Sequence, residues 1–209
     1  MNTGPESPEA VHRFWFADAI EDPRAAEARH DVWFETSAEF DAAIRQRFVP
    51  TMEAAVRGAL ADWKRVPQSC VALVIVLDQF PRNVYRGTPA AFACDARALE
   101  VTRRAIAAGY WEHLSIMERT FLLMPYEHVE DVAAQREGLP LFERLHAEAP
   151  ASWRNVTGNT LAYARSHLAI VERFGRFPHR NAILGRTSTD AEREYLASND
   201  ETFGQGTAG

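Results

Sequence analysis

The heptapeptide Val71-Ala72-Leu73-Val74-Ile75-Val76-Leu77 decides the fold class of this 209-residue chain. Its β-branched residues suit a buried strand. The sequence contains no second run of this kind to pair with it, and an isolated buried strand would leave its backbone N–H and C=O groups without partners. We therefore predict that the heptapeptide is a buried helix and that the fold is all-α.

Local signals for helix ends flank this stretch on both sides. Ser7-Pro8-Glu9 combines a capping side chain, a proline at the first helical position and an acid in the first turn. Ser115 to Glu118 and Thr189 to Glu192 match the capping box, in which a hydroxyl and a carboxylate cap the same helix start. Gly109 and Gly175 are predicted to end helices.

Prolines set the other predicted boundaries. The segments expected to be helical in the middle of the chain are residues 31–48 (continuous or restarting at Ser37), 51–63, 88–108, 115–125, 127–145 and 153–174. Pro50 and Pro125 are expected to end the helices that precede them, because proline lacks an N–H and clashes with the preceding turn. Thr51 is expected to cap the next helix, and Gly138-Leu139-Pro140 to interrupt the fifth segment.

The expected architecture follows from this succession of helices and short links. Eight or nine helices in antiparallel hairpins, stacked as a small solenoid-like domain, are the natural arrangement. We predict a single all-α domain over residues 7–198, with disordered ends at residues 1–6 and 199–209.

Composition excludes several classes of protein. The sequence is 46% hydrophobic and 11% aromatic, which excludes wholesale disorder. Its net charge of −6 argues against a nucleic-acid surface. Two cysteines in apolar contexts, no signal-peptide pattern at the N-terminus and no apolar run of about 20 residues favour a soluble, cytoplasmic protein without a membrane partner.

Two related basic segments suggest a binding site. Residues 80–88 and residues 173–189 both run Phe-Pro, then Arg-Asn, then mostly apolar residues, an Arg/Gly pair and a threonine. We predict that the two segments form one cationic pocket that binds an anion. The competing interpretation is that Arg176, Arg180 and Arg186 are structural locks between helices, paired with the acids at residues 127–131.

Acidic residues and a histidine cluster between residues 127 and 131. If this segment is one helix, Asp131 lies close to both Glu127 and His128, as in a carboxylate-oriented imidazole. The alternative is an acidic helix N-terminus, which the helix dipole favours.

Three further side chains each have two interpretations. Asp78 ends the buried stretch and needs a partner such as Arg82 or Arg86; it is either a salt bridge that fixes the next loop or part of a ligand site. His179 either contacts an anion or transfers a proton, or it hydrogen-bonds to backbone. His167 is interpreted as a core histidine rather than a ligand.

Metal and cofactor sites are not indicated. The sequence has no HExxH motif, no cysteine pair with zinc spacing, and no Walker or dinucleotide-binding pattern. His128, His167, His179, Glu127 and Asp131 could supply metal ligands, but nothing in their spacing favours that use. We predict no metal and no cofactor.

The chain resembles the bacterial domain-of-unknown-function 924 family over residues 12–196. The matching residues are Phe14-Trp15-Phe16, Trp63, Leu77 to Asn83, Tyr85 to Thr88, Asp95, Glu118-Arg119, Pro125 to His128, Glu130-Asp131, Arg173 to Asn181 and Leu184 to Thr189. The resemblance implies a tetratricopeptide-like helical superhelix. It implies no activity, because the family has none assigned.

Two hypotheses on function follow. The first is a pocket for a small carboxylate or phosphate ester, with acid/base chemistry. The second is a non-enzymatic tetratricopeptide-like scaffold that binds a peptide or partner protein. Under the first, the acid/base residues are Glu127, His128, Asp131 and His179, and the ligand-binding residues are Asp78, Arg82, Asn83, Arg86, Arg119, Arg176, Arg180, Asn181 and Arg186. Sequence reasoning favours the first, because polar titratable groups gather where sites usually lie.

Overall fold

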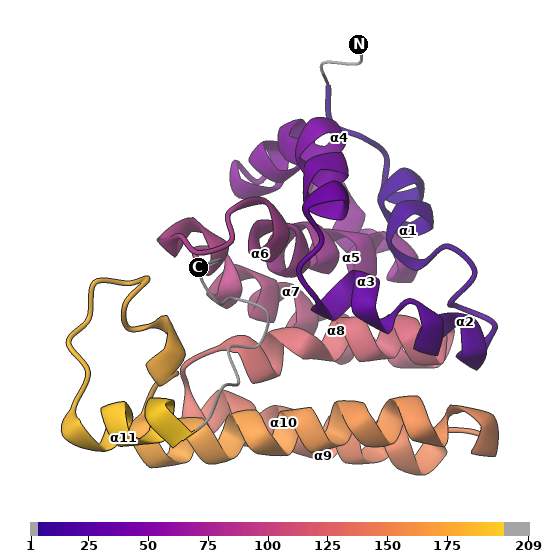
Figure 1. Cartoon of the computed structure of the whole chain (residues 1–209). Helices are drawn as coiled ribbons and strands as arrows, with labels where there is room; N and C mark the ends of the chain where they lie inside the picture. Colours follow the sequence, from indigo (N-terminus) through magenta and orange to yellow (C-terminus); the bar gives the residue numbers. More distant parts are fainter. Residues whose placement is uncertain (1–3, 199–209) are drawn as a thin grey trace.

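The computed structural model describes residues 4–198, and every regular element in that range is a helix, which confirms the all-α fold class (Figure 1). The α-helices are α1 Pro8–Phe16, α2 Pro23–Ala28, α3 His30–Phe34, α4 Ala38–Val56, α5 Pro67–Val74, α6 Phe80–Val84, α7 Asp95–Ala107, α8 Ile116–His128, α9 Val132–Glu148, α10 Arg154–Phe174 and α11 Asp190–Ser198. The shorter helical turns are η1 Ala61–Arg65, η2 Ile75–Gln79, η3 Pro89–Ala91, η4 Tyr110–His113, η5 Ala151–Trp153 and η6 Pro178–Arg180.

The ends of the chain were expected to be disordered. Residues 1–3 and 199–209 lie outside the described range. Within it, the backbone N–H of Glu6 donates to Thr51 Oγ1 at 2.8 Å, and the Glu6 carboxylate pairs with Arg47 at 2.9 Å. No helix in the described range is long and apolar enough to cross a membrane.

The decisive heptapeptide is a buried helix, as predicted. It forms the end of α5 and then the π-helix η2, where the N–H of Phe80 bonds to the carbonyl of Ile75. Pro81 accounts for the wider turn, because its ring would clash with the carbonyl four residues earlier in a regular α-helix. The π-turn places Asp78 and Gln79 inside the molecule, 0% and 5% exposed.

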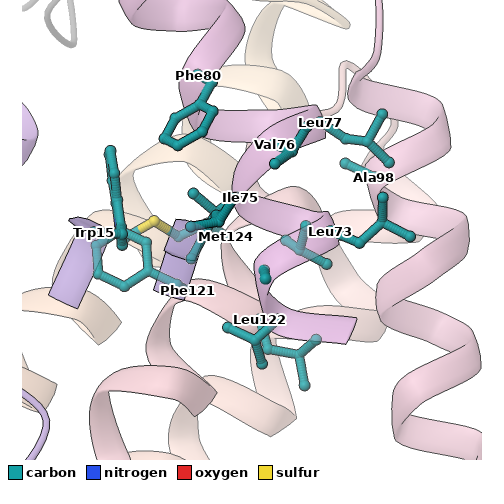
Figure 2. Packing of buried hydrophobic residues seen from close by; sticks show 14 of the residues in the cluster. Trp15, Leu73, Ile75, Val76, Leu77, Phe80, Ala98, Phe121, Leu122 and Met124 are labelled. Carbon is teal, nitrogen blue, oxygen red and sulfur yellow. The ribbon is translucent and has the colours of Figure 1, made fainter. Parts of the chain in front are cut away.

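The core surrounds this segment. Figure 2 shows Ile75 among Trp15, Phe121 and Met124, with Phe80 nearby. The rings of Trp15 and Phe121 meet edge-on, with centroids 5.4 Å apart. A helix that is apolar on every face is stable only when it is buried, so the other helices pack around α5 and η2.

Three prolines lie inside helices, so the predicted breaks there are wrong. Pro50 is within α4, Pro125 within α8 and Pro140 within α9. An internal proline costs a helix about 3 kcal/mol. Burial of neighbours such as Phe48 and Met52 offsets this cost, since each fully buried large apolar side chain contributes about 1.5–3 kcal/mol. Tertiary packing therefore overrides the local signal.

Thr51 and Thr88 also differ from the prediction. Thr51 lies inside α4 rather than capping a helix. Thr88-Pro89 opens only the short turn η3, and α7 begins at Asp95. Asp95 is held at that point by two arginines from other segments, which local sequence does not reveal.

The predicted capping residues and glycine ends agree with the structure, whereas α4 ends at Val56 rather than near Trp63 and α9 begins at Val132 rather than at Glu127. Ser7, Ser37 and Ser115 cap α1, α4 and α8 through their hydroxyls. Thr189 and Glu192 form the second capping box, with backbone-to-side-chain bonds of 2.7 and 3.2 Å. Gly109 and Gly175 have φ of 74° and 70°, the left-handed conformation that ends helices.

Helices α8, α9 and α10 form two successive antiparallel hairpins, seen at the bottom of Figure 1. Near the turn between α8 and α9, Tyr126 Oη donates to Glu137 Oε1 at 2.7 Å. Between α9 and α10, Arg165 donates to Glu143 Oε1 at 2.9 Å. Because both hairpins are antiparallel, α8 and α10 run in the same direction. Their corresponding ends therefore lie at the same end of the molecule.

Candidate functional site

A cavity of about 550 Å³ lies between α8 and α10 and is covered by α2 and α3. A volume of this size suits a small organic ligand. The lining residues are Ala26, Glu27, His30, Asp31, Trp33, Phe34, Gln79, Arg82, Asn83, Arg86, Met117, Thr120, Met124, Glu127, His128, Asn155, Val156, Asn159, Thr160, Tyr163, His167, His179 and Arg180. Titratable side chains gather where α8 and α10 approach η6.

The two Arg-Asn segments meet at Asp95, so their predicted proximity is observed. Arg82 donates from Nη1 and Nη2 to the two Asp95 oxygens at 2.8 and 3.0 Å, and also from Nη1 to the Asp78 carbonyl at 2.7 Å. Arg180 donates to Asp95 Oδ2 at 3.2 Å. One carboxylate at the start of α7 thus joins the first segment to the second.

Arg180 is the more deeply enclosed of the two arginines. It is 5% exposed, and its guanidinium lies 4.3 Å from the ring centre of Phe92 and 4.5 Å from that of Phe177. Burial lowers the pKa of Arg180 to about 10, which still leaves it charged at neutral pH. Its buried Nε–H has no hydrogen-bond acceptor in the described part of the chain. An acceptor supplied by a ligand would remove this penalty.

His128 is oriented by Asp78. The Asp78 carboxylate accepts from His128 Nδ1 at 2.8 and 2.9 Å. Burial would raise the pKa of Asp78, but its contacts with His128 and Arg82 lower it overall, so Asp78 is ionised. Burial and the Arg82 charge lower the pKa of His128, so its ring is neutral at pH 7. The Nδ1–H tautomer leaves Nε2 as the basic nitrogen.

Glu127 lies beside that basic nitrogen. It is 6% exposed, its Oε1 is 3.9 Å from His128 Nε2, and its buried Oε2 has no partner among the described residues. Burial, reinforced by the Asp78 charge, raises the pKa of Glu127 to about 8. At pH 7 a protonated carboxyl therefore faces an unprotonated imidazole, which is the pairing that acid/base chemistry requires.

Two more histidines line the same end of the cavity. His167 Nδ1 donates to the Tyr163 carbonyl at 2.8 Å, and its ring centre is 6.2 Å from that of His128. Burial, with smaller effects of His128 and Arg180 respectively, lowers the pKa of His167 and of His179 to about 3. His167 is 5% exposed, in agreement with a core position, yet it also borders the cavity.

Asp131 is not on the helix of His128, so the predicted Asp131–His128 pairing is wrong. Helix α8 ends at His128, and Asp131 caps α9 by accepting from Ala134 N at 3.0 Å. Asp78, 50 residues away in sequence, takes the orienting role instead. The error arose because the chain turns between His128 and Val132, where an uninterrupted helix had been assumed.

Several predicted ligand-binding residues do not line the cavity and make ion pairs or hydrogen bonds elsewhere. Arg119 pairs with Glu148, and Arg186 pairs with Glu130 at 2.6 Å. Arg176 pairs with Glu192, and Asn181 donates to Ser188 Oγ at 3.0 Å. These contacts match the alternative interpretation of structural locks.

Asn83 and Arg86 do line the cavity, but their acid partner was missed. Both donate to Asp41 of α4, at 2.7 and 3.2 Å. The three cavity arginines, Arg82, Arg86 and Arg180, thus face three aspartates, Asp41, Asp78 and Asp95. The pocket predicted to be cationic is therefore close to electrically balanced.

The apolar lining was also missed by sequence reasoning. It comes from Trp33, Phe34, Met117, Met124, Val156 and Tyr163. These residues fall on helical apolar stripes that look like ordinary core. Exposure separates two of them from core residues, because Phe34 is 40% and Tyr163 is 46% exposed, whereas Trp33, Met117 and Met124 are buried.

Metal-ligand geometry does not occur here. In residues 4–198 no group of three or more His, Cys, Asp or Glu side chains is placed to hold a metal ion. Cys70 and Cys94 are free thiols, and burial raises the pKa of Cys70 to about 11.

Comparisons with known proteins place the chain in a family without an assigned activity. A solved structure, described as a protein of unknown function from Agrobacterium tumefaciens, is similar with a TM-score of 0.77 and 36% identity, over 92% of this chain and 97% of that one. No curated protein matches the sequence. The family model for bacterial proteins of unknown function called DUF924 matches residues 11–200. The predicted resemblance is thereby confirmed, and the chain belongs to the DUF924 family.

Proposed function

We propose that the cavity binds a small organic anion, a carboxylate or a phosphate ester, and that Glu127 and His128 exchange protons with it. The observation that carries the proposal is the buried Glu127 carboxyl, with Oε2 unpartnered among the described residues, next to a histidine fixed by Asp78. A group in this position that served only stability would be better replaced by an apolar one.

Hydrogen-bond donors favour an anion over a cation. At pH 7 the protonated Glu127 carboxyl and the unsatisfied Nε–H of Arg180 both have a hydrogen to donate. The arginine charges are already balanced by Asp41, Asp78 and Asp95, so the unused hydrogen-bond donors, and not a net positive charge, favour an anion. An anionic oxygen would accept these hydrogens in charge-assisted bonds.

The expected chemistry is proton transfer. His128 Nε2 is placed to accept a proton and Glu127 to supply one, and the two atoms are 3.9 Å apart. One ligand atom would lose a proton to His128 while a neighbouring atom gains the proton of Glu127. Such an exchange rearranges the ligand without needing a redox partner.

The scaffold hypothesis has less support. It predicts that the motif residues lock helices together, which suits Arg176 and Arg186. It does not explain why Arg180, Glu127 and His128 border one cavity. A tetratricopeptide-like superhelix, a cytoplasmic location and a protein partner remain predictions.

Calorimetric titration with benzoate and phenyl phosphate tests the proposal, with neutral benzamide as the ligand control. Glu127→Leu should weaken binding of both anions about tenfold or more, because it removes the protonated carboxyl that donates a hydrogen to the anion. Glu194→Leu, a matched change at an exposed position, should leave binding unchanged. Absence of anion binding, or equal affinities in the two variants, would rule out the proposed site.

A further inference from the structure

The cavity is elongated, with its titratable groups at one end. Its lining on α8 runs from Met117 to His128, and its lining on α10 from Asn155 to His167. A helical rise of 1.5 Å per residue makes these stripes about 16 and 18 Å long. Because α8 and α10 run in the same direction, His128 and His167 share one end, while Met117 and Asn155 share the other.

The middle of the cavity is apolar and partly open. Trp33 and Phe34 of α3, Met124 of α8 and Tyr163 of α10 line it. Phe34 and Tyr163 belong to the few large apolar side chains that are exposed in the described range, and both line this cavity. Exposed aromatic side chains that line a hollow are typical of a binding surface.

The end far from His128 is unsuited to a second negative charge. Glu27 lies there, because its Oε1 accepts from Asn155 Nδ2 at 2.6 Å. A ligand with anionic groups at both ends would place one of them near this carboxylate. The cavity therefore has a donor-rich end, an apolar middle and an acidic end.

We propose that the ligand is a monoanion with an elongated apolar body of up to about ten carbon atoms. An extended chain advances about 1.3 Å per C–C bond, so such a molecule is about 14 Å long with its anionic group and fits within the lined stripes. The anionic group lies at Glu127, His128 and Arg180, and the body lies between α3, α8 and α10. This inference rests on the proposed anion site and adds the class of molecule that the site accepts.

Straight-chain carboxylates from acetate to dodecanoate test this inference by calorimetry. Affinity should rise about fourfold per added methylene, the value expected for burial of a CH₂ group, and should stop rising near decanoate. Octanedioate should bind more weakly than octanoate, because its second carboxylate meets the apolar middle and the acidic end.

Two variants of α10 test where the body lies. Thr160 lines the cavity about 10 Å from His167 along the helix. Thr160→Trp should bind acetate as tightly as the unmodified protein, but its affinity for longer carboxylates should stop rising near hexanoate. Val156→Phe, one turn further from His167, should end the gain at a longer chain and serves as the second test if the first variant does not fold. Ala162→Trp, an exposed position on the same helix, should behave like the unmodified protein.

The outcomes separate the two proposals. If acetate and benzoate bind in a way that depends on Glu127 but affinity does not depend on chain length, the elongated body is wrong and the anion site stands. If a length dependence appears but neither α10 variant shortens it, the body lies elsewhere and the inference is also overturned. If no anion binds in a way that depends on Glu127, the anion site itself is wrong.

Discussion

Replacing Glu127 with glutamine should make the folded protein more stable near neutral pH. Burial raises the pKa of Glu127 from 4.5 to about 8. Between these two values the folded state retains a proton that the unfolded state releases, so stability falls as pH rises through this window. At pH 7 the solution lies about 2.5 pH units above the pKa of this carboxyl in the unfolded state. This difference corresponds to a loss of about 3 kcal/mol in the free energy of unfolding.

Glutamine has nearly the same shape and carries no titrating proton, so Glu127→Gln should recover most of that loss. Urea denaturation at pH 4, 5.5, 7 and 8.5 measures the free energy of unfolding of both proteins. The difference should be near zero at pH 4, about 3 kcal/mol at pH 7 and larger at pH 8.5. Glu194→Gln, at an exposed position, should differ from the unmodified protein by less than about 0.5 kcal/mol throughout. A Glu127→Gln difference that does not change with pH would refute the raised pKa and with it the protonated carboxyl at pH 7.

Other predictions concern packing and the arginines. Gly138→Ala should destabilise the protein by about 1–3 kcal/mol in urea denaturation, because a Cβ there would lie 2.5 Å from Tyr126 Cβ at the crossing of α8 and α9. Gly158→Ala, whose Cβ would meet only the His146 ring at 3.4 Å, should be neutral or stabilising, and equal effects at the two sites would contradict the close crossing. Arg180→Ala should lower stability by about 3 kcal/mol, since it removes a buried guanidinium paired with Asp95 and packed on Phe92 and Phe177. Arg144→Ala, in exposed ion pairs, should cost less than about 1 kcal/mol, and a similarly small loss for Arg180→Ala would be inconsistent with its burial.

This expected loss changes how the site should be probed. Sequence reasoning treats Arg180 as a ligand-binding residue of a cationic pocket, which would make it the natural position for a binding variant. In the structure the Arg180 side chain is only 5% exposed and packs against the rings of Phe92 and Phe177. Replacing it would destabilise the fold, so a loss of binding in that variant would not report on the site alone. His128 and Glu127 are better positions for variants, because amide side chains of similar shape can replace them.

Signals confined to a few neighbouring residues were predicted well. The capping boxes at Ser115 and Thr189 and the glycine end at Gly175 each depend on one helical turn. The helix at residues 71–77 was predicted because no partner strand exists, an argument that uses the whole sequence. By contrast, the helix ends predicted at Pro50, Pro125 and Pro140 are wrong, because that prediction considers only neighbouring residues. Burial against helices distant in sequence outweighs the destabilisation that each proline causes.

The site was predicted in part. The repeated Arg-Asn pattern brought Arg82 and Arg180 into one hypothesis, and both meet at Asp95. The partner acids could not be assigned, because Asp41 and Asp95 contact arginines from segments far apart in sequence. Sequence reasoning did not find the apolar lining of the cavity for a similar reason. Phe34 and Tyr163 come from helices whose spacing in three dimensions leaves them uncovered, and no periodicity reports that.

The most direct test of the anion site is the affinity of benzoate as a function of pH, measured in the unmodified protein and in Glu127→Gln. Benzoate stays ionised from pH 6 to pH 9.5, so changes in affinity over that range report on the protein. The pKa of Glu127 is about 8. At higher pH Glu127 is a carboxylate that repels the ligand, so the affinity should fall about tenfold per pH unit. Glu127→Gln should show no such fall. Parallel pH profiles in the two proteins, or no benzoate binding in either, would contradict a protonated Glu127 at the centre of an anion site.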